Sequence, residues 1–107
     1  MNKYHNVKTT VNGITFDSRK EAERYIVLKA LEKTGTIQNL RLQVPFELSK
    51  PYKIAGKTVN GTKYIADFVY TQNGKEIVED VKGVKTAAYR IKRNWMHEKY
   101  GIVIREV

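Results

Sequence analysis

Two aspartates and a lysine, in two neighbouring strand-like segments, have the types and spacing that chemistry could use. Asp67 lies in "KYIADFVY", and Asp80 and Lys82 lie in "KEIVEDVK", with the turn signal Asn73-Gly74 between the segments. A two-residue turn would place Asp67 opposite Asp80, and a four-residue loop would place it opposite Val78 and diagonal to Asp80. In both registers Asp67, Asp80 and Lys82 share one face, because side chains alternate along a strand. A three-residue loop would break this arrangement.

Two carboxylates placed this way repel each other unless a cation lies between them. Mg²⁺ suits the pair, since it binds one or two protein carboxylates together with water and phosphate oxygens. Lys82 could then activate a water or stabilise charge on a phosphate oxygen. The alternative is a solvent-facing sheet in which Lys82 pairs with both aspartates. Apolar residues expected on the same face (Ile65, Val69, Val78) argue against that alternative, but the residues alone leave both open. Glu79 faces the other way, towards solvent or a salt bridge.

The segment from Ser18 to Gly35 is the clearest helix. Ser18 is a suitable N-cap, Glu21 three residues later completes a capping box, and Gly35 is a C-terminal stop. Glu21 therefore has an ordinary explanation as a cap residue. The apolar residues cover more than one stripe of the helix, which predicts that it is well buried; they are Ala22, Tyr25, Ile26, Val27, Leu28, Ala30 and Leu31.

The remaining elements are predicted from alternation and turn signals. Asn12-Gly13 indicates a turn or hairpin, and residues 49–62 indicate a long loop or loose hairpin. Residues 37–48 predict a strand with an edge or bulge at Pro45. The residues on one of its faces are Leu40, Leu42, Val44, Phe46 and Leu48, and those on the other are Arg41, Gln43 and Glu47.

Two further strands, a second helix and a last strand complete the chain. The strands cover 63–70, 75–82 and 102–107, and the helix covers 86–101 with Ala88, Ile91 and Trp95 at helical spacing. The order is helix, strand, strand, strand, helix, strand. The last three elements form a β-α-β unit, which predicts a final strand parallel to Glu76–Lys82. The fold class is α/β, with a mixed central sheet flanked by two helices.

Composition limits the classes of protein. The 107 residues suit one small domain, covering 1–107, with a short basic N-terminal arm over Met1 to Thr10. The absence of cysteine excludes a disulfide scaffold and thiolate zinc sites. No apolar run reaches transmembrane length and no secretion signal is visible, so we expect a cytoplasmic protein without membrane partners. The net charge of +9 favours an anionic partner, most often nucleic acid.

The motif "ADF…EDVKG", with Asp67 followed by Asp80-x-Lys82, resembles that of the PD-(D/E)XK nuclease superfamily. The αβββαβ order is also similar to the core of that superfamily, whose fold is restriction-endonuclease-like. From "FDSRKEAERY" to "REV", the chain is similar to a family of small phage-encoded proteins assigned there, which implies the cytoplasm of the host cell. Ala66 stands where the signature has proline.

The resemblance implies roles for individual residues. Asp67 and Asp80 would be ligands of Mg²⁺, for which Mn²⁺ can substitute, and the Val81 carbonyl would often join them. Lys82 would be the catalytic lysine, and Glu21 would contact the metal directly or through water. Gln43 corresponds to a glutamine that some members carry, although an exposed strand residue explains it equally simply. No organic cofactor is implied.

These observations together predict a metal-dependent endonuclease that hydrolyses phosphodiester bonds in DNA. With no separate sequence-reading domain, branched or junction DNA is the expected substrate in phage DNA metabolism, and cutting two strands would require a homodimer. The second helix offers a basic surface for DNA, or merely a solvated face: Lys85, Arg90, Lys92 and Arg93. The alternatives are a non-catalytic nucleic-acid-binding module on the same fold and a basic protein-interaction adaptor.

Overall fold

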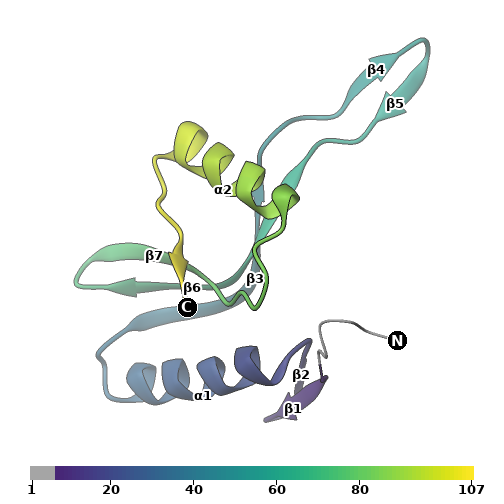
Figure 1. Cartoon of the computed structure of the whole chain (residues 1–107). Coiled ribbons are helices and arrows are strands. Elements are labelled where there is room, and N and C mark those ends of the chain that lie inside the picture. The colour runs from purple at the N-terminus through teal and green to yellow at the C-terminus, as the bar shows by residue number, and fades with distance from the viewer. Residues whose placement is uncertain (1–6) are drawn as a thin grey trace.

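A four-stranded mixed sheet separates two helices (Figure 1). The computed structural model describes residues 7–107. The sheet has the order β3-β6-β7-β8, and its strands are β3 (Gln38–Glu47), β6 (Lys63–Gln72), β7 (Lys75–Asp80) and β8 (Arg105–Glu106). Neighbours pair antiparallel except β7 and β8, which are parallel as predicted. The helices α1 (Arg19–Lys33) and α2 (Ala87–Tyr100) lie on opposite faces of the sheet. The protein is therefore mixed α/β, as expected.

Two small hairpins add to this arrangement. The first joins β1 (Thr9–Val11) to β2 (Ile14–Phe16) through the expected Asn12-Gly13 turn. The second joins β4 (Tyr52–Ile54) to β5 (Lys57–Val59) and extends away from the sheet (Figure 1). The radius of gyration is 15.9 Å, whereas a compact chain of this length has one of about 13 Å. The projecting hairpin accounts for this difference.

The basic N-terminal arm expected over residues 1–10 is only partly testable. Residues 1–6 lie outside the described residues, and the last two residues of the expected arm belong to β1. Within residues 7–107, neither helix combines the length and apolar character needed to cross a membrane.

Both helices begin and end where the sequence indicates. The hydroxyl of Ser18 accepts a hydrogen bond from the backbone N–H of Glu21 at 3.1 Å, and Thr86 caps α2 in the same way. Gly35 and Gly101 follow the two helices with φ of 78° and 68°. Positive φ costs glycine little, so these residues end the helices without strain.

The helix faces were only partly predicted. Helix α1 buries Ala22, Tyr25 and Leu28 against the sheet, but Ile26 is 52% exposed and Val27 46% exposed, so the prediction of a well-buried helix was wrong. One face of the helix meets the sheet, and nothing in the described residues covers the other.

Helix α2 turns two residues towards the sheet that the expected spacing did not include. Tyr89 and Met96 are buried, whereas Ile91 is 61% exposed and Ala88 is exposed. Trp95 packs at the margin of the core and is half-buried. Tyr89 and Met96, and not Ile91, therefore form the contact of α2 with the core.

A kink in the sheet changes which face its side chains occupy. Each helix packs on the sheet through a separate apolar core, which we call the α1 core and the α2 core. Leu40 and Leu42 of β3 pack in the α1 core, whereas Val44 and Phe46 pack in the α2 core. The expected single apolar face of this strand was therefore wrong. Gln43 lies at the change, with a φ of 52°, and this left-handed backbone interrupts the regular alternation.

The partner strand β6 shows the same change. Tyr64 and Ala66 pack in the α2 core, while Phe68 and Tyr70 pack in the α1 core. Pairing of Leu42 with Phe68 and of Val44 with Ala66 places Asp67 opposite Gln43, at the kink. The kink therefore brings Asp67 to the point where the two cores meet. Ile65, expected on the apolar face, is instead 53% exposed.

Candidate active site

The register of the β6-β7 hairpin fixes the relation between the two aspartates. Gln72 pairs with Lys75, and the pairing continues to Phe68 opposite Glu79. Asn73 and Gly74 form the two-residue turn, both with positive φ. The next positions along the strands are Asp67 and Asp80, so the first of the two open registers is the observed one. Each of the two carboxyl groups shifts the pKa of the other, so they lie close together.

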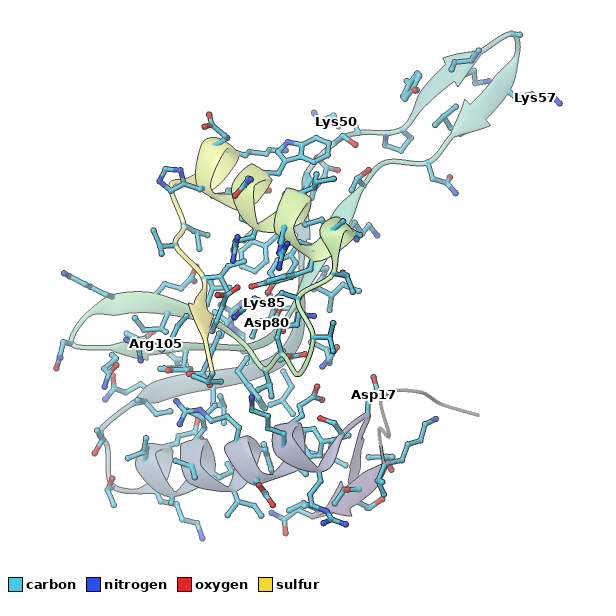
Figure 2. The ribbon with its side chains drawn as sticks, in the orientation of Figure 1. Asp17, Lys50, Lys57, Asp80, Lys85 and Arg105 are labelled. Atoms are coloured by element: carbon cyan, nitrogen blue, oxygen red, sulfur yellow. The ribbon has the colours of Figure 1, made fainter. Side chains whose placement is uncertain are left out.

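Asp80 is a buried carboxylate with one oxygen unsatisfied. Its side chain is 1% exposed, and it lies between the layers of the protein (Figure 2). The Tyr64 hydroxyl donates a hydrogen bond to Oδ2 at 2.5 Å, whereas Oδ1 has no hydrogen-bond partner among the described residues. Burial, followed by the interaction with Asp67, raises the pKa of Asp80 to about 7. This oxygen forms an ion pair with the Nζ of Lys82, 3.6 Å away, but accepts no hydrogen bond, which is costly for a buried oxygen. A bound cation would satisfy it.

Asp67 is held by the backbone of the next strand. The Val81 N–H donates to its Oδ2 at 2.8 Å, and the Gln43 amide approaches its Oδ1 at 3.5 Å. Burial raises the pKa of Asp67, although the interaction with Asp80 and the hydrogen bond from the Val81 N–H oppose that effect. Val81 thus contributes its N–H to the site; its carbonyl as a metal ligand stays a prediction.

Glu21 reaches the same place from the first turn of α1. Its side chain is nearly buried, with 8% of the residue exposed. Burial raises the pKa of Glu21, the interaction with Asp67 lowers it, and the charges of Asp17 and Asp80 raise it further. Among the described residues the Glu21 carboxylate accepts no hydrogen bond from the Ser18 N–H, so only half of the capping box forms. The side chain is directed to the aspartates instead.

Lys82 follows β7 and completes the group. Its Nζ lies 3.6 Å from the unsatisfied Oδ1 of Asp80 and 4.7 Å from the centre of the Tyr89 ring. The side chain is 31% exposed, so solvent reaches the ammonium group. Backbone contacts with Val107 and Lys20 fix the chain at this point, with distances of 3.3 Å each. The predicted residues Glu21, Asp67, Asp80 and Lys82 therefore lie together.

The donor set fits a divalent cation of the Mg²⁺ class. Within residues 7–107 no three Asp, Glu or His side chains form a ready-made metal-ligand cluster. Mg²⁺ does not require one, because it keeps several waters and uses one or two carboxylates. Asp67 and Asp80 supply two such carboxylates; a contact of Glu21 with the metal, directly or through water, stays a prediction.

Comparison with known proteins places the chain in a family. The sequence profile of one family matches residues 1–106. The chain belongs to the family described as protein of unknown function (DUF1064). No curated protein matches it.

Two tyrosines at the site were missed from the sequence. Tyr64 supports Asp80, and Tyr89 lies under Lys82 and donates to Glu106 at 2.6 Å. Burial raises the pKa of both tyrosines, so both remain hydrogen-bond donors. Simple alternation along β6 places Tyr64 on the opposite face from Asp67, so it does not predict that Tyr64 reaches the site. The kink brings the two together, and the sequence gives no signal for it.

Glu79 satisfies its charge by a salt bridge on the α1 side of the sheet. It is fully buried and bonds Arg24 through both oxygens, at 2.5 and 2.9 Å. The Tyr70 hydroxyl donates to it at 2.5 Å. This pair fastens α1 to β7, and thereby holds Glu21 against the aspartates.

The basic surface expected on α2 divides into two parts. Lys85 and Arg93 both meet Glu106, at 3.8 and 3.1 Å, so part of their charge is compensated. Lys92 lines a hollow next to Lys82, and Arg90 is exposed. Gln43 is exposed as well as near Asp67.

Proposed function

We propose that this protein is a metal-dependent nuclease that hydrolyses phosphodiester bonds in DNA. The observation that carries the proposal is the unsatisfied Oδ1 of Asp80, buried beside Asp67 and 3.6 Å from the Nζ of Lys82. A structural role would be expected to satisfy that oxygen with a donor. A site for a cation and a phosphate leaves it free.

Each side chain has a role in this proposal. Asp67 and Asp80 hold Mg²⁺, which when bound polarises the scissile phosphate and lowers the pKa of an attacking water. The Val81 N–H and the Tyr64 hydroxyl orient the two carboxylates, each by one hydrogen bond. Lys82 is exposed enough to reach a phosphate oxygen and to stabilise its charge.

Further support comes from the order of elements. The series α1, β3, β6, β7, α2, β8 matches the αβββαβ order of the restriction-endonuclease-like core. Asp67 lies on β6, Asp80 ends β7 and Lys82 follows two residues later, and Glu21 lies on the first helix, an arrangement similar to that of the PD-(D/E)XK superfamily. We propose that the family of this chain belongs to that superfamily, with Ala66 in place of the signature proline.

A second function, DNA binding without cleavage, also has an observation in its favour. Lys63, Lys82 and Lys92 line one hollow that has no acidic residue among its lining residues, as a surface for phosphates would. A module that only binds DNA would keep the basic surface and would cleave no DNA, whether or not Lys82 is changed. Cleavage of DNA therefore distinguishes the two functions.

The test is cleavage of duplex, single-stranded, flap and four-way-junction DNA with Mg²⁺ or Mn²⁺. We expect Lys82→Ala to abolish cleavage and to leave DNA binding largely intact. Lys75→Ala is the matched control, because it removes the same charge at the far end of β7 from the site. Cleavage by Lys82→Ala at the wild-type rate, or no cleavage by the wild type on any substrate, contradicts the proposal.

A further inference from the structure

The hairpin of β4 and β5 stands away from the rest of the protein (Figure 1). We call residues 50–60 the arm; all of them are exposed except Val59, which is partly exposed. The arm strands pair from Tyr52 opposite Val59 to Ile54 opposite Lys57. An isolated two-stranded hairpin is only marginally stable in water, so an arm of this kind is typical of an element that has a partner.

The base of the arm is firmly attached to the sheet. The N–H groups of Leu48 and Ser49 donate to the Thr62 carbonyl at 2.8 and 3.1 Å, and the Thr62 N–H donates to the Ser49 hydroxyl at 2.9 Å. At Gly61 a Cβ would lie 2.1 Å from the Ser49 carbonyl oxygen, so only glycine permits this close approach. These contacts fix the root from which the arm extends.

The charge of the arm has one sign. It carries Lys50 at its base, then Lys53, then Lys57 near its outer end (Figure 2), and the sequence has no acidic residue from 48 to 66. Within residues 7–107 none of these three lysines forms an ion pair. Lys85 and Arg93, in contrast, share Glu106. The positive charge of the arm is therefore available to a partner.

A positively charged hollow lies next to the root of the arm. Its volume is about 310 Å³, and Lys63, Lys82 and Lys92 are among its lining residues, with no acidic residue. Lys63 directly follows the arm root at Thr62, and Lys82 belongs to the candidate active site. The hollow thus connects the arm to the residue that we place at the phosphate.

We propose that the arm enters a groove of double-stranded DNA while the hollow receives the phosphate backbone. The major groove, about 12 Å wide, admits a two-stranded ribbon. Lysines along the arm would neutralise phosphates beside the groove, and the exposed Tyr52 and Ile54 would contact base edges and sugars. A second copy of this chain suits the arm less well, because each copy has a net charge of +9. That the phosphate backbone of the DNA lies at Lys82 rests on the proposed nuclease function. Binding of duplex DNA by the arm does not depend on it.

The test compares two triple variants that lose the same charge. The arm variant carries Lys50→Gln, Lys53→Gln and Lys57→Gln. The control variant carries the same change at three exposed lysines away from the arm, which are Lys8, Lys33 and Lys75. Fluorescence anisotropy in EDTA measures binding to a labelled 20-bp duplex and to one of its single strands, and thermal melting checks that both variants fold.

We expect the arm variant to bind the duplex at least tenfold more weakly at 100 mM NaCl, and the control variant less than threefold more weakly. The slope of log K against log[salt] should fall by about 0.9 for each phosphate that the protein no longer neutralises, hence by about 2 to 3 for the arm variant. Single-strand binding should change less than duplex binding. Equal losses of affinity in the two variants, or equal losses for the two ligands, overturn the proposal.

A partner other than DNA gives a different result. If the arm binds a second copy, Tyr52→Ser with Ile54→Thr will convert a dimer to a monomer in sedimentation while duplex affinity stays unchanged, and that outcome overturns the proposal. The experiments also distinguish a failure of the arm proposal from a failure of the nuclease proposal. A wild type that cleaves, with an arm variant that binds like the control, removes only the arm proposal. A wild type that never cleaves, with an arm variant that loses duplex binding, removes only the nuclease.

Discussion

The pH dependence of stability gives the sharpest test of the electrostatics at Asp80. Its side chain is 1% exposed, and burial together with Asp67 raises its pKa from 3.8 to about 7. Between those values the folded protein binds a proton that the unfolded chain has released. Stability therefore falls as the pH rises through this window.

The size of the effect follows from the pKa difference. Integrated from pH 5 to pH 8, one carboxyl with these two values removes about 2.5 kcal/mol from the free energy of unfolding, since each pH unit within the window is worth about 1.36 kcal/mol. Asp80→Asn removes this titration and retains an oxygen that can accept the Tyr64 hydrogen bond. In metal-free buffer, the free energy of unfolding of the variant should therefore fall by about 2.5 kcal/mol less than that of the wild type between pH 5 and pH 8.

Urea unfolding in EDTA at pH 5, 6, 7 and 8 measures the effect. Glu98→Gln is the control, because Glu98 is exposed on α2 and forms no hydrogen bond or ion pair with the site among the described residues; it should follow the wild type. If Asp80→Asn changes the difference between pH 5 and pH 8 by less than about 0.5 kcal/mol, the buried carboxyl is not protonated as the structure implies.

Three other predictions concern the metal, the helix glutamate and the arm root. Asp67→Asn with Asp80→Asn should raise the melting temperature without metal, because two repelling carboxylates are removed, and should abolish stabilisation by Mg²⁺; an unchanged Mg²⁺ response would place the ion elsewhere. Glu21→Gln should cost well under about 1 kcal/mol in urea unfolding yet slow cleavage strongly, with partial rescue by high Mg²⁺ or by Mn²⁺; cleavage near the wild-type rate would remove Glu21 from the site. Gly61→Ala should destabilise the protein by about 2 kcal/mol or more, since its Cβ would lie 2.1 Å from the Ser49 oxygen; a melting curve like that of the wild type would show that the root relaxes freely.

Local signals in the sequence determined the ends of the two helices and the turn between β6 and β7, whereas the last strand, expected over 102–107, covers only Arg105–Glu106. Ser18 and Gly35 limit α1, and Asn73-Gly74 sets the hairpin turn, because caps and tight turns depend on residues within a few positions. That turn also predicted, as one of two registers, the pairing of Asp67 with Asp80. Period-two alternation then grouped the chemically interesting residues correctly.

Tertiary structure decided which face each residue occupies. The left-handed backbone at Gln43 moves Leu40 and Leu42 to the α1 core and Val44 to the α2 core, which no alternation rule anticipates. Whether Ile91 is buried likewise depends on how α2 lies on the sheet, not on its spacing along the helix.

The sequence by itself determined that two aspartates and a lysine could meet, since a short hairpin brings them within reach, and the resemblance to a family implied Glu21 beside them. Only the folded chain decided that one oxygen of Asp80 is buried without a hydrogen bond from any described residue, because burial depends on the layers packed above and below the strand. Only the folded chain also decided that Glu79 bonds Arg24 and not solvent. Contacts between residues 55 positions apart are set by packing, and no local pattern contains them.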